Sequence, residues 1–317
     1  MNTALIALDW GTTSLRAYAI AADGSMIGTR EAALGIMQVQ NGDFNAALRQ
    51  CCGDWLDAAP HARLIASGMI GSKQGWKEAP YCPCPANAAA IADAMVSIDI
   101  PGARTLYIVP GVSCVAAASG LPAMRGGPGS SDVPGVPDVM RGEETQVFGA
   151  LPATGNHLAI LPGTHSKWVW MDDSRITRFS SWMTGEVYAA LTQHTILGRL
   201  MQLDAPHDEA TFERGVCYGF DDPGSLLQRI FSARTLGLFA QLEATALPSY
   251  LSGVLIGTEI GGALARVTHA PPEITVLGTP LLVQRYVTAL AICGYRTQPG
   301  AADAARIGLT ALAAKLA

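Results

Sequence analysis

The chain has 317 residues, 49% of them hydrophobic, enough for one large domain or two domains of ordinary size with well-filled cores. Its formal net charge is −5 and it has no basic run, which argues against nucleic acid as a partner. No apolar run reaches the roughly 18–20 residues of a membrane span. The N-terminus also lacks the features of a signal peptide, so we expect a cytoplasmic protein without membrane contact.

The first predicted element is a hairpin near the N-terminus. Residues 5–8 are an apolar run of the length of a buried strand, and Asp9 follows them directly. A second apolar run covers residues 15–20 and leads into Asp23-Gly24, a pair typical of tight turns. The hairpin therefore carries a carboxylate at one tip.

The bend at that tip has the composition of a phosphate-binding loop. Gly11 lets the backbone approach a phosphate oxygen closely, while Thr12 and Thr13 add hydroxyl and N–H donors. The carboxylate of Asp9 beside them suits a metal ion that is bound to the phosphate. From this stretch alone, an ordinary polar turn without a phosphate remains the alternative.

A long polar loop follows the next two predicted elements. Residues 44–57 have the apolar spacing of a helix, and residues 63–66 form a short predicted strand. Because ligands bind at strand ends in open α/β sheets, we expect residues 67–85 to bind substrate, with a purely structural loop as the alternative. The residues of this loop that we assign to the substrate are Ser67, Gly68, Met69, Lys73 and Trp76.

The seven cysteines are an odd number at irregular spacing, which fits a reducing compartment better than a disulfide framework. Cys82 and Cys84 are separated by one proline. A metal pair is conceivable there, but no second pair lies nearby in the sequence. We therefore interpret both as ordinary thiols.

The middle of the chain changes character several times. Residues 87–98 predict a helix, residues 105–110 a strand, and residues 120–138, rich in Gly, Pro and Ser, an irregular surface loop. The stretch after the loop opens a helix whose first turn contains Glu143 and Glu144. Acids are favoured there by the helix dipole, so capping alone would account for them.

Residues 158–170 repeat the design of the first hairpin. An apolar strand leads to a bend at Gly163-Thr164, and a second strand leads to an acidic turn at Asp172-Asp173. Two such hairpins at corresponding places suggest a duplicated domain with a nucleotide in the cleft between the copies. We expect the second bend, together with the adjacent His165, to contact phosphate.

Helices dominate the prediction for the rest of the chain. Thr184 and Gly185 either line the phosphate side of the cleft or cap the helix predicted over residues 187–200. The next predicted helices cover residues 210–218, 226–247 and 249–266, with Pro248 separating the last two. The last of these has a glycine at every fourth position, which we attribute to tight helix packing.

A strand–glycine–helix unit and one further helix complete the prediction. Residues 274–277 form a strand that enters Gly278-Thr279, and a helix follows over residues 281–293. Residues 302–317 predict an amphipathic helix, which we expect to pack beside this unit.

The two hairpins resemble the first and second phosphate motifs of the sugar kinase, Hsp70 and actin superfamily. Within it, the chain resembles the 2-dehydro-3-deoxygalactonokinase family along nearly its whole length. The stretches that carry this resemblance are LDWGTTSLRAY, SGMIGSKQGWKEAPYCPC, MRGEETQ and LPGTHSKWV, in that order. The second and third are much more specific than the two phosphate motifs.

The resemblance implies an α/β protein of two ribonuclease-H-like domains, each a mixed sheet flanked by helices. Residues 1–153 would hold the sugar site, and residues 154–317 most of the nucleotide site, with Gly278 and Thr279 nearest the adenosine. ATP and Mg²⁺ are the implied cofactors. The implied reaction is phosphorylation of 2-dehydro-3-deoxy-D-galactonate on its 6-hydroxyl, and a homodimer is compatible with all of this.

The residues leave some roles open. Many superfamily kinases carry a catalytic aspartate about twenty residues before the second Gly-Thr bend, where this chain has Glu143, so the base is either Glu143 or Asp9. We assign the base to Glu143 and Mg²⁺ anchoring to Asp9. The side chains that could pair with the substrate carboxylate or the developing phosphate charge are Arg141, Lys73 and Arg16.

Three alternative functions remain at this point. A kinase of another sugar or sugar acid would keep every motif. A non-catalytic ATPase of the same superfamily would lack the substrate loop, and an ATP-independent sugar-acid sensor would not need two phosphate hairpins.

Overall fold

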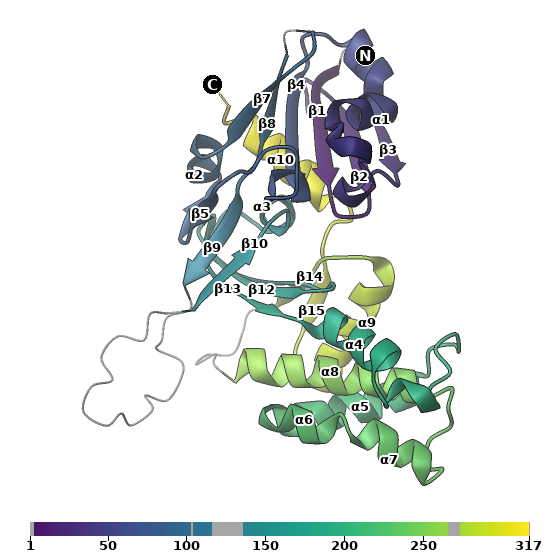
Figure 1. Cartoon of the computed structure of the whole chain (residues 1–317). Coiled ribbons are helices and arrows are strands. Elements are labelled where there is room, and N and C mark those ends of the chain that lie inside the picture. The colour runs from purple at the N-terminus through teal and green to yellow at the C-terminus, as the bar shows by residue number, and fades with distance from the viewer. Residues whose placement is uncertain (1–2, 103, 116–135, 266–272, 317) are drawn as a thin grey trace, which may run out of the picture.

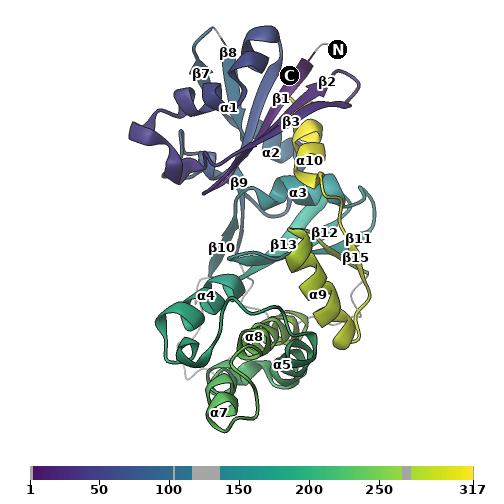
Figure 2. The same ribbon diagram turned by 90° about the vertical axis from the view of Figure 1, so that its right-hand side faces the viewer.

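The computed structural model describes residues 3–102, 104–115, 136–265 and 273–316, in which two large sheets enclose a layer of two helices (Figures 1 and 2). The strands of the first sheet are β1 (Thr3–Trp10), β2 (Leu15–Ala21), β3 (Met26–Ala32), β4 (Arg63–Gly68), β7 (Val96–Ile100) and β8 (Arg104–Ile108). Those of the second are β6 (Ala86–Asn87), β11 (Asn156–Leu161), β12 (Ser166–Asp172), β13 (Arg175–Trp182), β14 (Ile274–Val276) and β15 (Thr297–Pro299). A small sheet joins β5 (Tyr81–Pro83), β9 (Gly111–Val115) and β10 (Pro137–Met140).

The two large sheets repeat one topology. The first runs β3-β2-β1-β4-β8 and the second β13-β12-β11-β14-β15, with β7 and β6 added at opposite edges. In each, three strands form an antiparallel meander, and two more strands continue parallel to the first of them. This is the ribonuclease-H-like arrangement, present twice. The predicted fold class and both predicted hairpins are confirmed.

Helices cover both outer faces and fill the space between the sheets (Figure 2). The helices are α1 (Phe44–Ala58), α2 (Ala88–Asp93), α3 (Glu143–Ala150), α4 (Thr184–His194), α5 (Glu209–Asp221), α6 (Leu226–Arg229), α7 (Ser232–Leu238), α8 (Leu247–Leu264), α9 (Pro280–Ile292) and α10 (Ala304–Ala313). One face of the first sheet packs on α1, and one face of the second packs on α5, α8 and α9. The other two faces share a core with α3 and α10.

The layer between the sheets depends on two glycines. A Cβ atom on Gly149 of α3 would lie 1.8 Å from the carbonyl oxygen of Ala304, and one on Gly308 of α10 would lie 1.8 Å from that of Thr145. The two helix backbones are therefore in direct contact. The prediction that the last helix packs beside the strand–glycine–helix unit is wrong, because α10 packs mainly on α3 and the first sheet.

Two other predicted helices differ from the structure. The helix predicted over residues 87–98 ends at Asp93, and residues 96–100 form β7, whose alternating exposure suits an edge strand paired with β8. The helix predicted over residues 226–247 is divided into α6 and α7. Pro248 does not separate two helices but lies in the first turn of α8, where its missing N–H costs little.

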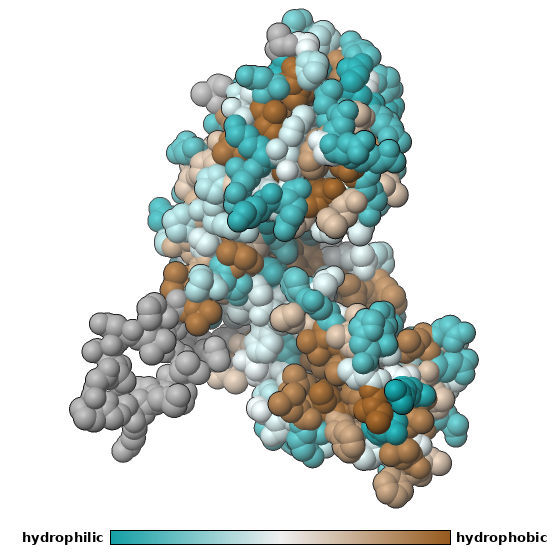
Figure 3. Space-filling model, viewed as in Figure 1, coloured by the Kyte–Doolittle hydropathy of each residue, from teal (hydrophilic) through white to brown (hydrophobic). Residues whose placement is uncertain are grey.

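The glycine repeat of α8 serves helix packing, as predicted. A Cβ atom on Gly257 would lie 2.2 Å from the Val216 carbonyl oxygen, and the same closeness recurs from α5 at Gly219. Figure 3 shows apolar residues gathered over the helices at this end of the molecule. The exposed large apolar side chains of α6, α7 and their flanks are Leu227, Phe231, Leu238 and Phe239.

Most of the loop predicted over residues 120–138 lies outside the described residues. Its last two residues belong to β10, which pairs with β9 and leads directly to the turn before α3. Within the described residues, no helix is both long and apolar enough to cross a membrane.

Candidate active site

A cleft of about 760 Å³ lies where the strand ends of the two large sheets face each other. It is bordered by the ends of β1, β4 and β11, by the start of α3 and by the segment that joins β14 to α9. Thirteen residues predicted from the sequence line it: Asp9, Gly11, Thr12, Arg16, Gly68, Met69, Arg141, Glu143, Gly163, Thr164, His165, Gly278 and Thr279. Residues far apart in the sequence thus meet in one place.

Four predicted site residues do not line this cleft. Thr13 and Lys73 are exposed outside it. Trp76 stacks on Phe44, with ring centroids 5.8 Å apart, and packs edge-on against the buried Trp10, so its half-buried ring packs against the core. Ser67 is fully buried next to Asp9 across the parallel β1–β4 pair, and its hydroxyl has no partner among the described residues.

A contact between two glycines forms the floor of the cleft. Gly68 has φ +90°, and a Cβ atom there would lie 2.8 Å from the Trp10 carbonyl oxygen. Gly142 has φ +107°, and a Cβ atom there would lie 3.2 Å from the Cα of Gly68. Since side chains rarely tolerate such φ values, glycine is needed at both positions. The contact brings Glu143, at the start of α3, near Asp9, at the end of β1.

Glu143 and Asp9 each have a basic neighbour. Burial raises the pKa of Glu143, and Lys167, whose Nζ lies 4.0 Å from Oε1, partly offsets this. Burial also raises the pKa of Asp9; Arg16 opposes the rise and the charge of Glu143 adds to it. Lys167 is nearly buried and Arg16 is half exposed. The sequence analysis gave Lys167 no role, although it lies in a stretch that carries the family resemblance.

Glu144 holds the turn that positions Glu143. Both of its carboxylate oxygens accept the N–H of Gly142, at 2.9 and 2.8 Å, and the Thr145 hydroxyl donates to the Gly142 carbonyl at 2.7 Å. Burial and the neighbouring Glu143 raise the pKa of Glu144 to about 8. Glu143 likewise accepts the N–H of Arg141, at 2.9 Å. Both acids therefore fix the backbone just before α3, and Glu143 also faces the cleft.

Arg141 offers donors that are not used within the described residues. Its Nη2 donates to the Ala79 carbonyl at 2.9 Å, and the guanidinium lies over the Tyr81 ring, 4.4 Å from the centroid. Its Nε and Nη1 are buried without a partner there. A buried cation with free N–H groups is suited to bind an anion.

The second bend is supported by the start of α4. A Cβ atom on Gly185 would lie 2.4 Å from the Gly163 carbonyl oxygen, and the N–H of Glu186 donates to the Thr164 carbonyl at 3.0 Å. The Glu186 side chain also hydrogen-bonds the His165 ring. Gly185 therefore lies against the phosphate-type bend itself. Thr184 makes no side-chain cap of α4, because its hydroxyl donates to a buried glutamate, Glu259.

Glu259, in α8, is the centre of a buried network that the sequence analysis missed. It accepts hydrogen bonds from Ser166, Trp168 and Tyr286, each at 2.7 Å, and from Thr184. Burial raises its pKa, while these hydrogen bonds favour the ionised form. One side chain thereby joins β12, α4, α8 and α9. Its only sequence signal is a single acid in a helix that is otherwise apolar and glycine-rich.

A small pocket of about 70 Å³ extends from the second bend between α4, α8 and α9. Besides Gly163, Thr184 and Gly185, its lining is mostly apolar and aromatic, with two polar side chains: Tyr188, Leu255, Ile256, Leu282 and Tyr286, together with Ser252 and Arg285. It is enclosed by the same helices that Glu259 holds together.

No cluster of three or more His, Cys, Asp or Glu side chains suited to a metal ion occurs among the described residues. Cys82 is buried and Cys84 half-buried, both as free thiols.

A duplicated ribonuclease-H-like fold, with one Gly-Thr hairpin from each copy facing a shared cleft, defines a member of the sugar kinase, Hsp70 and actin superfamily. Comparison with known proteins narrows this class. The chain belongs to the family described as 2-keto-3-deoxy-galactonokinase, which it matches over residues 9–312. As a member of this family it is an ATP-dependent sugar-acid kinase, as the resemblance implied.

Individual relatives support the assignment. The chain is 36% identical over 313 residues to a Rhizobium meliloti (strain 1021) protein named "Probable 2-dehydro-3-deoxygalactonokinase", covering 97% of this chain and 95% of that protein. It is 30% identical over 305 residues to the 2-dehydro-3-deoxygalactonokinase of Escherichia coli (strain K12), covering 96% and 95%. A crystal structure from Sinorhizobium meliloti with the same designation superposes with a TM-score of 0.85 at 35% identity, covering 98% of both chains.

Proposed function

We propose that the chain transfers the γ-phosphoryl group of ATP to the 6-hydroxyl of 2-dehydro-3-deoxy-D-galactonate, which gives the 6-phosphate. The observation that carries this proposal is the meeting of Asp9 and Glu143 between the two Gly-Thr bends. Phosphoryl transfer needs positioned phosphates, neutralised charge and a group that orients or deprotonates the acceptor hydroxyl. The family supports the choice of substrate.

In this proposal the phosphates of ATP lie between the two bends. Gly11 and Gly163 let the backbone come close, and Thr12 and Thr164 supply hydroxyl donors. The nucleoside passes Gly278 and Thr279, whose segment borders the same cleft. The small pocket beside Gly163 suits a purine base, because most of its lining is apolar or aromatic surface.

We assign the anchoring of Mg²⁺ to Asp9. The donor set fits this ion, since Mg²⁺ keeps several waters and needs only one or two carboxylates together with the phosphates. A site with a single buried carboxylate is therefore sufficient. When bound, Mg²⁺ neutralises the charge on the phosphate oxygens.

We assign the general base to Glu143. A base works best when its pKa lies near the operating pH, and burial raises the pKa of Glu143 in that direction. The nearby Lys167 favours the ionised form, which is the one able to accept a proton. Glu144 and the Gly68–Gly142 contact fix the backbone that carries this carboxylate.

We assign the binding of the substrate carboxylate to Arg141. Its free Nε and Nη1 groups lie in the cleft region beside the substrate loop, whereas Lys73 is exposed outside the cleft. Replacing Arg141 by Met removes a charge-assisted hydrogen bond worth about 1.5–3 kcal/mol, roughly ten- to hundredfold in KM for the acid. The neutral alcohol analogue should be little affected; an equal loss on both compounds would contradict the assignment.

The two halves are proposed as functional units. Residues 1–153 supply Asp9, Glu143 and the substrate loop, and residues 154–317 supply the second bend and the nucleoside segment. The boundary at residue 153 separates the two parts of the site but not two independently packed units. The strand β6 from the first half joins the second sheet, and α10 from the second half packs with the first sheet.

The experiment that tests the function is a coupled assay of ADP release over a panel of aldonic and 2-keto-3-deoxy acids. We expect 2-dehydro-3-deoxy-D-galactonate to give the highest kcat/KM, with phosphate on the 6-oxygen of the product. A higher kcat/KM with another acid would make the chain a kinase of that acid. ADP release independent of any acid would identify an ATPase instead.

A further inference from the structure

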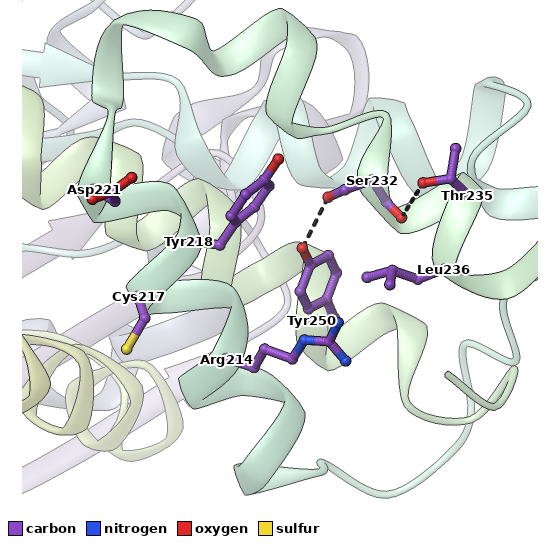
Figure 4. Close-up of a pocket in the computed structure, with 8 residues that line it drawn as sticks. All are labelled: Arg214, Cys217, Tyr218, Asp221, Ser232, Thr235, Leu236 and Tyr250. Atoms are coloured by element: carbon purple, nitrogen blue, oxygen red, sulfur yellow. Dashed lines mark hydrogen bonds between the residues drawn. The ribbon is translucent and has the colours of Figure 1, made fainter. Parts of the chain in front are cut away.

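The helices of the second half border another cavity, which is broad and open to solvent and has a volume of about 570 Å³, between α5, α7 and the beginning of α8 (Figure 4). Eight residues line it, and none of them lines the cleft or the small pocket described above. Its volume lies within the roughly 300–1,000 Å³ typical of small-molecule sites. The proposed kinase reaction gives it no role.

One face of α5 forms a wall of this cavity. Arg214, Cys217, Tyr218 and Asp221 are spaced i, i+3, i+4 and i+7, so they lie along one side of the helix. The neighbouring side of α5 is fixed to α8, because a Cβ atom on Gly215 would lie 2.2 Å from a backbone carbonyl oxygen of α8. The wall is therefore held in place by backbone contact.

The charge in the cavity is uneven. Arg229 pairs with Asp221 at 3.0 Å and also reaches Asp222 at 3.9 Å, so the acidic end is neutralised. Arg214 lies at the other end, with its guanidinium 5.9 Å from the centre of the Tyr250 ring. No ion pair joins Arg214 to a carboxylate of the described part of the chain. An available cation remains.

Aromatic surface lies between the two ends. Figure 4 shows the rings of Tyr218 and Tyr250 in the middle of the cavity and the side chain of Arg214 extended beneath Tyr250. The Tyr250 hydroxyl hydrogen-bonds Ser232 of α7 at 2.9 Å, which fixes the orientation of its ring. Flat apolar surface beside a free guanidinium favours a ligand with a flat body and one negative group.

We propose that this cavity is a second small-molecule site, which takes an aromatic or heteroaromatic carboxylate. The carboxylate pairs with Arg214, and the ring system lies against Tyr218 and Tyr250. This site is separate from the proposed kinase site, and its occupation can be tested without any enzymatic assay.

The first test compares two probes of equal shape, naphthalene-2-carboxylate and the neutral naphthalene-2-carboxamide, by calorimetric titration of the full chain. We expect the carboxylate to bind at least about tenfold more tightly than the amide, because only the carboxylate can make a charge-assisted hydrogen bond to Arg214. Arg214→Gln should abolish this preference. Arg199→Gln is the matched control, since Arg199 is exposed in the same group of helices but outside the cavity; it should keep the preference.

The second test locates the bound probe. Cys217 is the exposed thiol among the free cysteines, and it lines the cavity. We expect naphthalene-2-carboxylate to slow its alkylation by N-ethylmaleimide, measured by peptide mass spectrometry on the unaltered sequence. Cys217→Trp should occupy part of the cavity and weaken binding of the probe.

The control outcomes are equally definite. An aromatic probe that only adheres to the exposed apolar residues Leu227 and Phe239 would bind Cys217→Trp as well as the unaltered chain. That result, or alkylation of Cys217 at an unchanged rate, would overturn the proposal. So would a preference for the carboxylate that persists in Arg214→Gln.

Discussion

The two hairpins that face the cleft have the same frame but different chemistry at their tips. Two residues before the bend glycine, the first hairpin has Asp9 and the second has Leu161. Their cross-strand partners are both basic, Arg16 in the first and Lys167 in the second. The repeat thus preserves the cation and keeps the acid in one copy only.

The difference shows how a repeated fold can divide one reaction between its copies. In the first hairpin, Arg16 favours the ionised form of the acid on its own sheet. In the second, no acid stands opposite Lys167, which instead faces Glu143 at the start of α3. The cation of the second hairpin therefore lies beside an acid that belongs to a helix from the other half of the chain.

The strongest test of this comparison is Glu143→Gln. If Glu143 is the base, we expect kcat to fall by about 10²–10⁴, the usual worth of general acid–base catalysis, with ATP-Mg²⁺ affinity nearly unchanged. Asp9→Asn should instead weaken the Mg²⁺ dependence together with turnover. Measurement of kcat as a function of Mg²⁺ concentration for each variant separates the two roles. Near-normal kcat in Glu143→Gln, with turnover lost in Asp9→Asn at saturating Mg²⁺, would make Asp9 the base.

A second prediction concerns the helices that distinguish the two halves. Gly257→Ala should lower the free energy of unfolding by about 1–3 kcal/mol, because the new methyl group meets a carbonyl oxygen of α5. The matched change Gly53→Ala in α1 meets only ordinary contact, 3.6 Å from Arg49, and should be neutral or slightly stabilising. Urea denaturation measures both. Equal effects would mean that the α5–α8 contact can relax.

A third prediction tests whether the charge of Lys167 influences Glu143. Lys167 lowers the pKa of Glu143 against the effect of burial. Lys167→Met should therefore move the acidic limb of the kcat–pH profile to higher pH. Arg16→Gln removes the cation beside Asp9 instead, and this variant serves as the comparison. An unmoved acidic limb in Lys167→Met would show that the Lys167 charge does not act on the base.

The last prediction concerns the buried carboxyl group of Glu144. Its pKa is raised from 4.5 to about 8 on folding, so the folded chain holds a proton that the unfolded chain releases between these values. Stability from this group is fully present below pH 4.5 and is lost as pH rises toward 8. Glu144→Gln mimics the protonated acid and should reduce the loss of stability between about pH 5 and pH 8. An unchanged pH dependence of the urea midpoint would contradict this.

The parts of the fold that the sequence predicted are those that depend on neighbouring residues. Both hairpins follow from short apolar runs and turn pairs, and α1 follows from apolar spacing and the Asp43 cap. Residues 96–98 were predicted as the end of a helix because they continue an alanine-rich stretch, but pairing with β8 outweighs that local preference. The break between α6 and α7 likewise has no strong local signal.

The site shows the same limit. Asp9 and Gly163 were predicted because each lies in a recognisable bend, and Glu143 because of its distance from the second bend; all three line the cleft. Lys167 and Glu259 were missed, because their partners lie 24 and up to 93 residues away in the sequence, and only the folded chain brings them together. Trp76 was assigned to the substrate from composition, although aromatic rings also fill cores.

The direct backbone contact of α3 and α10 has a consequence for how the protein is made. The inner face of the first sheet is covered in part by a helix that is synthesised after every strand of both sheets, since Leu309 and Leu312 of α10 belong to the same core as Ile65 of β4. Domains generally fold in the order of their synthesis. Here the first sheet must wait, with apolar surface uncovered, until residues 304–313 have been translated. The second sheet can assemble against α5, α8 and α9 before that moment.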